Sequence, residues 1–184
     1  GNYTVKLAGI HQLNPDEFDL NTVDRAAKTR WMIGTKGKFQ INPRWMFGWD
    51  LMTQSDKNFA YTYGLGGYSS YLQRNDIYLT GLSGRNYFDL RAMKFNLQES
   101  TAVAALSQDP RQPWVLPLLD YSWYAPRPVF GGELNFTVNG QGIARFERDP
   151  VAAATSVPGI EGTSGRVTAE AEWKRTFIAP GGLS

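Results

Sequence analysis

Eight stretches of this chain alternate apolar and polar residues with a period of two, and short and long connections take turns between them. Successive side chains of a β-strand point to opposite faces of the sheet, so this period predicts strands with one apolar face each. The expected strands are residues 3–12, 28–40, 44–55, 69–82, 85–98, 114–124, 130–147 and 166–178.

The connections between these strands predict two unlike rims. The expected short connections are 41–43, 83–84, 125–129 and 179–182, and the expected long ones are 13–27, 56–68, 99–113 and 148–165. Outer-membrane β-barrels have short periplasmic turns and longer extracellular loops. The predicted fold class is therefore all-β, an antiparallel up-and-down meander of about eight long strands, with the short turns on the periplasmic side.

The segment 130–147 shows the alternation most clearly. Phe136 and Val138 fall on one face, and Asn135 and Asn139 fall on the other. A strand this long suits the roughly 9–11 residues that cross a membrane better than the usual five or six of a globular strand. In residues 85–98 the apolar positions change phase after Ala92, which predicts a β-bulge there.

Alternation alone does not separate a membrane barrel from a soluble one, because a soluble sandwich or lipocalin-like barrel also shows one apolar face per strand. Strand length, polar faces rich in amides and glycine, and aromatic residues near strand ends favour the membrane. Those aromatic residues are Trp31, Trp45, Tyr61, Tyr63, Trp114 and Trp123. The sequence contains no run of about 18 apolar residues, so it predicts no transmembrane helix.

The composition excludes several classes of function. Lysine and arginine number 19 against 17 acidic residues, so a net charge of +2 gives no reason to expect a nucleic-acid partner. The chain has no cysteine and one histidine, which excludes disulfides, thiolate metal sites and clustered histidine sites. We expect no cofactor.

Few residues suggest catalysis. Glu170 and Glu172 share a face with Lys174, and paired carboxylates can perform acid–base chemistry, but a hydrated charge ladder along a wall explains the same spacing. His11 could serve a membrane hydrolase as general base, although the sequence places no hydroxyl beside it. The first long connection has acidic residues without the fixed spacing of a calcium loop. These are Asp16, Glu17, Asp19 and Asp24. We therefore expect no catalytic residue and no metal site.

Several strand-and-turn motifs are distinctive. They are 44–50 (RWMFGWD), 55–59 (SDKNF), 113–122 (PWVLPLLDYS), 131–135 (GGELN), 162–166 (GTSGR) and 172–175 (EWKR). With these motifs the chain resembles the lipopolysaccharide-assembly family LptD, formerly called the organic solvent tolerance protein family, over nearly its whole length.

The resemblance implies a translocon rather than an enzyme. Members of that family form a barrel of about 26 strands in the bacterial outer membrane. The lipoprotein LptE plugs the barrel, and a periplasmic jelly-roll domain receives lipopolysaccharide from a bridge of similar folds. The sugar part passes through the lumen while the acyl chains leave between the first and last strands. Lipopolysaccharide, an LptE-like plug, the periplasmic bridge and outer-membrane lipid are the implied partners.

On this interpretation residues 1–184 are one partial barrel domain, truncated at both ends, that forms an arc of the wall. The jelly roll, the first and last strands of the barrel and the family's cysteines then lie outside it. Polar side chains are expected to line the hydrated lumen, where they either contact sugar, phosphate or plug, or are simply solvated. The candidates are Glu133, Asn135, Asn139, Glu170, Glu172 and Lys174.

Two alternatives stay open at the level of sequence. Eight strands can close, so the chain could be an intact small outer-membrane barrel, either adhesin-like or a hydrolase using His11. It could also be a soluble lipid-binding β-barrel.

Overall fold

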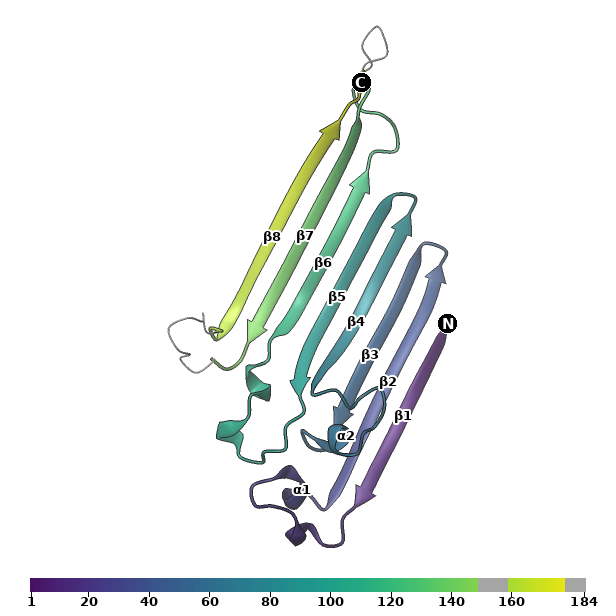
Figure 1. The fold of residues 1–184 in the computed structure, drawn as a ribbon. Coiled ribbons are helices and arrows are strands. Elements are labelled where there is room, and N and C mark those ends of the chain that lie inside the picture. Colours follow the sequence, from purple (N-terminus) through teal and green to yellow (C-terminus); the bar gives the residue numbers. More distant parts are fainter. Residues whose placement is uncertain (149–158, 178–184) are drawn as a thin grey trace.

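The computed structural model describes residues 1–148 and 159–177. Its strands form a single antiparallel sheet in which every strand pairs with its neighbours in sequence (Figure 1). The strands are β1 (Asn2–His11), β2 (Thr29–Asn42), β3 (Trp45–Gln54), β4 (Leu72–Ser83), β5 (Asn86–Leu97), β6 (Trp114–Tyr124), β7 (Glu133–Arg145) and β8 (Gly162–Lys174). The predicted all-β meander is confirmed.

The helices of the described residues are short, and all of them lie in the long connections. They are η1 (Pro15–Glu17), α1 (Val23–Ala26), α2 (Phe59–Thr62), η2 (Ala104–Leu106) and η3 (Asp109–Arg111). Figure 1 shows these connections at one end of the sheet and the short turns at the other. The predicted alternation is confirmed for the first six connections. The predicted turn at 179–182 lies outside the described residues, as do residues 149–158 of the last long connection.

The strand boundaries agree with the prediction to within four residues, and the largest difference occurs at β8. The segment 125–132 is a longer turn than expected, because Phe130 and Gly131 adopt positive φ angles of 50° and 73° and Val129 pairs with Gly132. This turn delays β7 to Glu133. β8 begins at Gly162, four residues before the expected start at 166.

The predicted bulge is present in the pairing of β5 with β6, but the extra residue belongs to β6. Arg91 pairs with Leu118 and Met93 with Val115, so two residues of β6 stand opposite one of β5. On its other side β5 pairs with β4 without interruption. The apolar side chains after the phase change, Met93, Phe95 and Leu97, therefore lie on the face opposite to Phe88 and Leu90. Long connections cover part of that face.

The sheet is open. β1 and β8 each pair on one side only within the described residues, so the two closed-barrel alternatives, membrane and soluble, are not what the structure shows. Large apolar side chains stand exposed along the strands, including Leu7 at 70% and Val167 at 77%. The buried apolar residues of the described chain are few: Met32, Phe59, Ala60 and Tyr68 form a cluster at the end with the long connections, and Val23 and Leu97 are buried besides. This is the geometry of an arc of wall rather than of a packed globule.

Candidate functional site

The register of the sheet assigns its side chains to two faces, because residues directly opposite each other in an antiparallel pair lie on the same face. What we call the apolar face carries, among others, Val5, Leu7, Ile33, Phe47, Trp49, Ile77, Leu79, Phe88, Leu90, Leu119, Tyr121, Phe136, Val138, Val167 and Ala169. What we call the polar face carries Lys6, Arg30, Lys36, Asp50, Asp76, Asp89, Arg91, Asp120 and Thr137. The predicted apolar faces thus join into one continuous surface across all eight strands.

The six residues predicted for a lumen wall all lie on the polar face of β7 and β8. Glu133 pairs in register with Lys174 and Asn135 with Glu172, while Glu170 and Asn139 follow further along the same face. Lys174 Nζ lies 2.7 Å from Glu172 Oε1. The structure therefore brings Glu133, Asn135, Glu170, Glu172 and Lys174 into one strip of charge and amide groups, and Asn139 lies at its end.

Asn139 and Glu133 connect this strip to its neighbours. The side-chain amide of Asn139 donates to Asp120 on β6, and Glu133 forms an ion pair with Arg85 in the turn before β5. The Arg85 guanidinium also lies over the ring of Tyr124, 4.1 Å from its centre. These contacts link β6, β7 and the turn before β5 on the polar face.

A second polar cluster, in the middle of the sheet, escaped the sequence analysis. Arg91 holds Asp89 with two hydrogen bonds, 2.7 Å from Nε to Oδ1 and 2.9 Å from Nη2 to Oδ2, and lies 3.5 Å from Asp76. Tyr87 donates its hydroxyl to Asp89 at 3.0 Å. Both aspartates are buried. The signal was available, because Asp89 and Arg91 are two residues apart and so share a face, as Glu172 and Lys174 do.

A buried charge cluster fastens two long connections to the sheet. Arg30, at the start of β2, is fully buried and binds Asp56 with two hydrogen bonds of 2.8 and 2.9 Å. It also pairs with Asp24 of α1, and its guanidinium lies 5.5 Å from the ring centre of Phe59 in α2 and 5.7 Å from that of Tyr63. We call Arg30, Asp24 and Asp56 the clasp.

Burial and hydrogen bonding act in opposite directions on Asp56, which lies in the connection outside the strands. Burial by itself raises the pKa of its carboxyl group. Hydrogen bonds from Arg30 and from the Asn58 backbone N–H favour the charged form, and together with the Ser55 hydroxyl they lower the pKa below its ordinary value. Asp56 therefore stays ionised inside the clasp.

The second long connection, residues 55–71, folds over the polar face. The ring of Tyr68 occupies the space above Gly34 that a side chain there would need, and Lys6 of β1 donates to the Gly66 carbonyl at 2.8 Å. Glycine at position 34 thus permits the close approach. The polar face is covered at the long-connection end of β1–β3 and open along β7 and β8.

The third long connection is hydrogen-bonded to the second. Gln98 donates to the carbonyls of Tyr68 and Ser70 at 2.5 and 2.9 Å. Lys57 donates to the Ser107 hydroxyl at 2.6 Å, and that hydroxyl donates to Glu99 at 2.7 Å. Three consecutive long connections therefore form one ordered rim, although each was predicted only as a loop.

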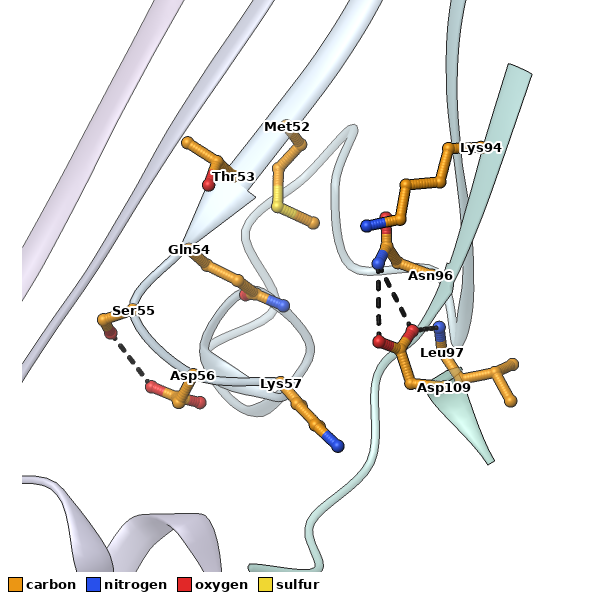
Figure 2. A pocket seen from close by; sticks show the side chains of 10 residues that line it. All are labelled: Met52, Thr53, Gln54, Ser55, Asp56, Lys57, Lys94, Asn96, Leu97 and Asp109. Atoms are coloured by element: carbon orange, nitrogen blue, oxygen red, sulfur yellow. Dashed lines mark hydrogen bonds between the residues drawn. The ribbon is translucent and has the colours of Figure 1, made fainter. Parts of the chain in front are cut away.

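A cavity of about 290 Å³ lies at this rim where β3 separates from β4 and β5 (Figure 2). Its lining comes from the end of β3, the following loop, the end of β5 and η3: Met52, Thr53, Gln54, Ser55, Asp56, Lys57, Lys94, Asn96, Leu97 and Asp109. Asp109 accepts hydrogen bonds from the Leu97 N–H at 2.6 Å and from the Asn96 amide at 3.3 and 3.5 Å. Polar groups thus close the gap between the strands.

The candidates for catalysis and metal binding are not brought together. His11 Nδ1 lies 3.0 Å from the Thr29 hydroxyl, at the exposed end of β1. In the first connection Asp24 belongs to the clasp, and Asp16 lies 3.6 Å from Arg25. In residues 1–148 and 159–177 no group of three potential metal-ligating side chains converges.

Comparison with known families decides the assignment. The family model described as "LptD: LPS transport system D" matches residues 28–184. The chain belongs to the LptD family. No curated protein and no solved structure matches the chain. LptD proteins serve lipopolysaccharide transport and assembly at the outer membrane, and the family is not one of enzymes.

The LptD match and the sheet agree. The match covers seven of the eight strands completely, and the meander in one open sheet is the arrangement expected for a piece of barrel wall. In the part of the chain that the structure describes, no helix is long and apolar enough to cross a membrane.

Proposed function

We propose that this chain is an arc of the wall of an outer-membrane barrel through which lipopolysaccharide reaches the outer leaflet. The observation that carries the proposal is the pair of unlike faces, which run unbroken across eight strands while large side chains of the apolar face stand exposed. Lipid would cover the apolar face, and the polar face would line a hydrated lumen. Residues 1–184 would then be part of one barrel domain whose other strands pair with the edges of β1 and β8.

The proposal gives the polar strip of β7 and β8 a role in the lumen. Glu133, Lys174 and Glu172 lie near the short turns, which would be periplasmic, where the sugar and phosphate groups of lipopolysaccharide enter. Alternating anionic and cationic groups suit hydrated, charged cargo without binding it tightly, because exposed ion pairs exchange readily with solvent. A plug lipoprotein of the LptE kind is the second partner for this strip, and a periplasmic bridge would supply the lipopolysaccharide.

The ordered rim would lie outside the cell. There the second long connection would fold into the lumen, since Tyr68 and Leu65 pack over the polar face of β1–β3. Its cover narrows this part of the lumen and leaves the region along β7 and β8 open.

Thiol labelling of neighbouring positions tests the assignment of the faces. Because the chain has no cysteine, Asn135→Cys and Phe136→Cys each add one thiol to it, on opposite faces of β7. In the whole protein in outer-membrane vesicles, a water-soluble maleimide should label position 135 and spare position 136. Equal labelling of the two positions, or the reverse order, would overturn the lumen proposal.

Labelling of intact cells tests the sidedness. Asp19 is exposed in the first long connection, and Arg127 is exposed in the turn between β6 and β7. A maleimide that cannot cross the membrane should modify Asp19→Cys in intact cells, and Arg127→Cys only after lysis. Labelling of Arg127→Cys in intact cells would show that the short turns are outside.

A further inference from the structure

The seam between β3 and β4 opens before the ladders on either side of it end. The last β3–β4 pair is Asp50 with Asp76, whereas the β2–β3 ladder continues to Gln54 and the β4–β5 ladder to Leu72. The divergence leaves a groove of about 500 Å³ on the apolar face, in the half of the sheet nearest the long connections. The groove shares Met52, Thr53, Lys94 and Asn96 with the cavity of Figure 2.

The lining of the groove is mainly apolar and carries one charge, with Thr35, Thr53, Asn75 and Asn96 as its uncharged polar residues. Its walls include Ile33, Leu51, Ile77, Ala92, Trp114 and Leu116. Among the described residues that line it, Lys94 is the only charged one. Its ammonium group lies 5.0 Å from the ring centre of Trp114 and forms an ion pair with no carboxylate of the described residues. Lys94 is half-buried and stands where the apolar groove meets the polar cavity of Figure 2. A cation that pairs with no carboxylate at the end of an apolar groove favours an anionic ligand.

Side-chain amides bridge the strands that form the walls of the groove. The Met52 N–H donates to Asn75 Oδ1 at 2.5 Å, and Asn75 Nδ2 donates to Asn96 Oδ1 at 3.0 Å. Asn96 donates in turn to Asp109 (Figure 2). These bonds replace the missing backbone ladder, so the groove exists before any ligand enters and no collapse of the strands is needed to satisfy their polar groups.

The order of groups along the strands is that of an amphiphile. Ile77 and Ala92 pair with each other toward the middle of the sheet, and Lys94 lies about 7 Å nearer the long connections. A lipid in the leaflet on that side would present its acyl chains to the middle of the membrane and its headgroup to Lys94.

We infer that this groove binds one lipopolysaccharide molecule from the lipid side, with an acyl chain between Leu51 and Ile77 and a phosphate on Lys94. The inference rests on the proposed function, in which the apolar face meets lipid and the long connections lie outside. The unpaired charge favours a multiply anionic lipid over a zwitterionic phospholipid. The site lies on the outer surface of the wall, apart from the polar face that would line the lumen.

Photocrosslinking in the whole protein tests the site. A benzoylphenylalanine is placed at Ile77, in the groove, or at Val138, on the same face of β7, and the protein is embedded in nanodiscs of lipopolysaccharide and phosphatidylethanolamine. Crosslinking to lipopolysaccharide should be about five-fold stronger at position 77 than at 138, the size of effect that one ion pair gives. Lys94→Gln should abolish the difference, and Lys94→Arg should keep it.

Each other outcome has a meaning of its own. Equal crosslinking at the two positions, or preferential capture of phosphatidylethanolamine at 77, overturns the groove and leaves the barrel proposal standing. Absence of any lipid adduct at both positions contradicts the barrel proposal itself. Should Lys94→Gln fail to fold, high salt applied to the unaltered chain replaces it, because screening should lower the adduct at 77 and leave that at 138 unchanged.

Discussion

Ion pairs lie on the same face near the two edges of the sheet, but they are buried near one edge and exposed at the other. At β1–β3 the Arg30 side chain is 0% exposed and its partner Asp56 8% exposed, whereas at β8 Lys174 is 70% exposed and its partner Glu172 40%. The difference comes from the second long connection, which covers the first region and does not reach the other. A buried ion pair must be desolvated and is costly to break, while an exposed pair is screened by water. The first therefore fixes structure, and the second stays accessible to solvent.

Arg30→Ala should have the largest effect, because it removes the buried cation of the covered region. Removing the cation leaves Asp24 and Asp56 without it in a buried site, so the rim should lose about 3–5 kcal/mol of stability. Hydrogen exchange of residues 55–71 in the whole protein measures the loss. The matched control is Arg25→Ala. Its ion pair with exposed Asp16 is 3.6 Å long, and its guanidinium also donates to the carbonyls of Asp16 and Phe18 at the surface, so the change should cost about 1–2 kcal/mol, clearly less than Arg30→Ala. Similar exchange in the two variants would mean that the clasp does not hold the rim.

The open end is tested on its two faces. Phe136→Arg places a charge on the apolar face of β7 and should cost about 2–4 kcal/mol if that face meets lipid near mid-membrane. Asn135→Arg adds the same charge to the polar face beside Glu172 and should cost far less. Denaturant titration of the whole protein in lipid vesicles gives both values. Equal costs would show that the faces are assigned wrongly.

The seam between the covered and the open region should respond more weakly. Asn75→Ala leaves the Met52 N–H without its acceptor and interrupts the chain of amides, which should cost about 1–3 kcal/mol. Exchange of the Met52 amide proton should accelerate in this variant. Asn14→Ala is the control, because its amide contact with Glu17 is exposed and 3.3 Å long. An unchanged Met52 amide would show that the seam does not depend on Asn75.

Acid should loosen the covered end by a smaller, graded amount. Because the pKa of Asp56 is lowered in the folded chain, its contribution to stability is complete above the ordinary aspartate pKa and is lost as the pH falls through the lowered value. Protease sensitivity of residues 55–71 should therefore rise as the pH falls below the ordinary aspartate pKa of about 4. Asp56→Asn should remove this pH dependence, and a transition that persists in that variant would assign it to another group.

The exposed pair should show the smallest effect. Glu172→Gln removes the partner of Lys174 in a solvated strip and should change the free energy of unfolding by less than about 1 kcal/mol. Its effect on lipopolysaccharide delivery should be larger than this loss implies if the strip contacts cargo or plug. A loss of several kcal/mol would place the pair with the clasp instead.

Much of the fold was predictable because barrel strands are long and their period is two. The bounds of β6 were predicted to the residue, and the six polar wall candidates were placed on one face by alternation alone. The start of β8 was missed by four residues because Gly162–Gly165 carries no apolar side chain to show the period. The bulge was assigned to β5 because its apolar phase changes, whereas the extra residue is in β6, where Leu116 and Pro117 interrupt the pairing.

The clasp and the groove were not predictable from the sequence. Arg30, Asp24 and Asp56 are separated by 6 and 26 residues and meet only because two connections fold back over the sheet. The groove depends on where the ladder between β3 and β4 ends, and the side chains that replace it lie on three different segments. The alternation of apolar and polar residues along one strand carries no information about contacts between segments far apart in the chain.

The sequence by itself determined the all-β class, the succession of strands and the unlike faces, because these follow from side-chain alternation along each strand. Only the tertiary structure decided that the sheet stays open, that one part of the polar face is covered, and that β3 and β4 separate at the rim with the long connections. Those features depend on contacts between residues far apart in the chain, where burial, charge pairing and the competition for backbone hydrogen bonds select one arrangement among many that the same alternation allows.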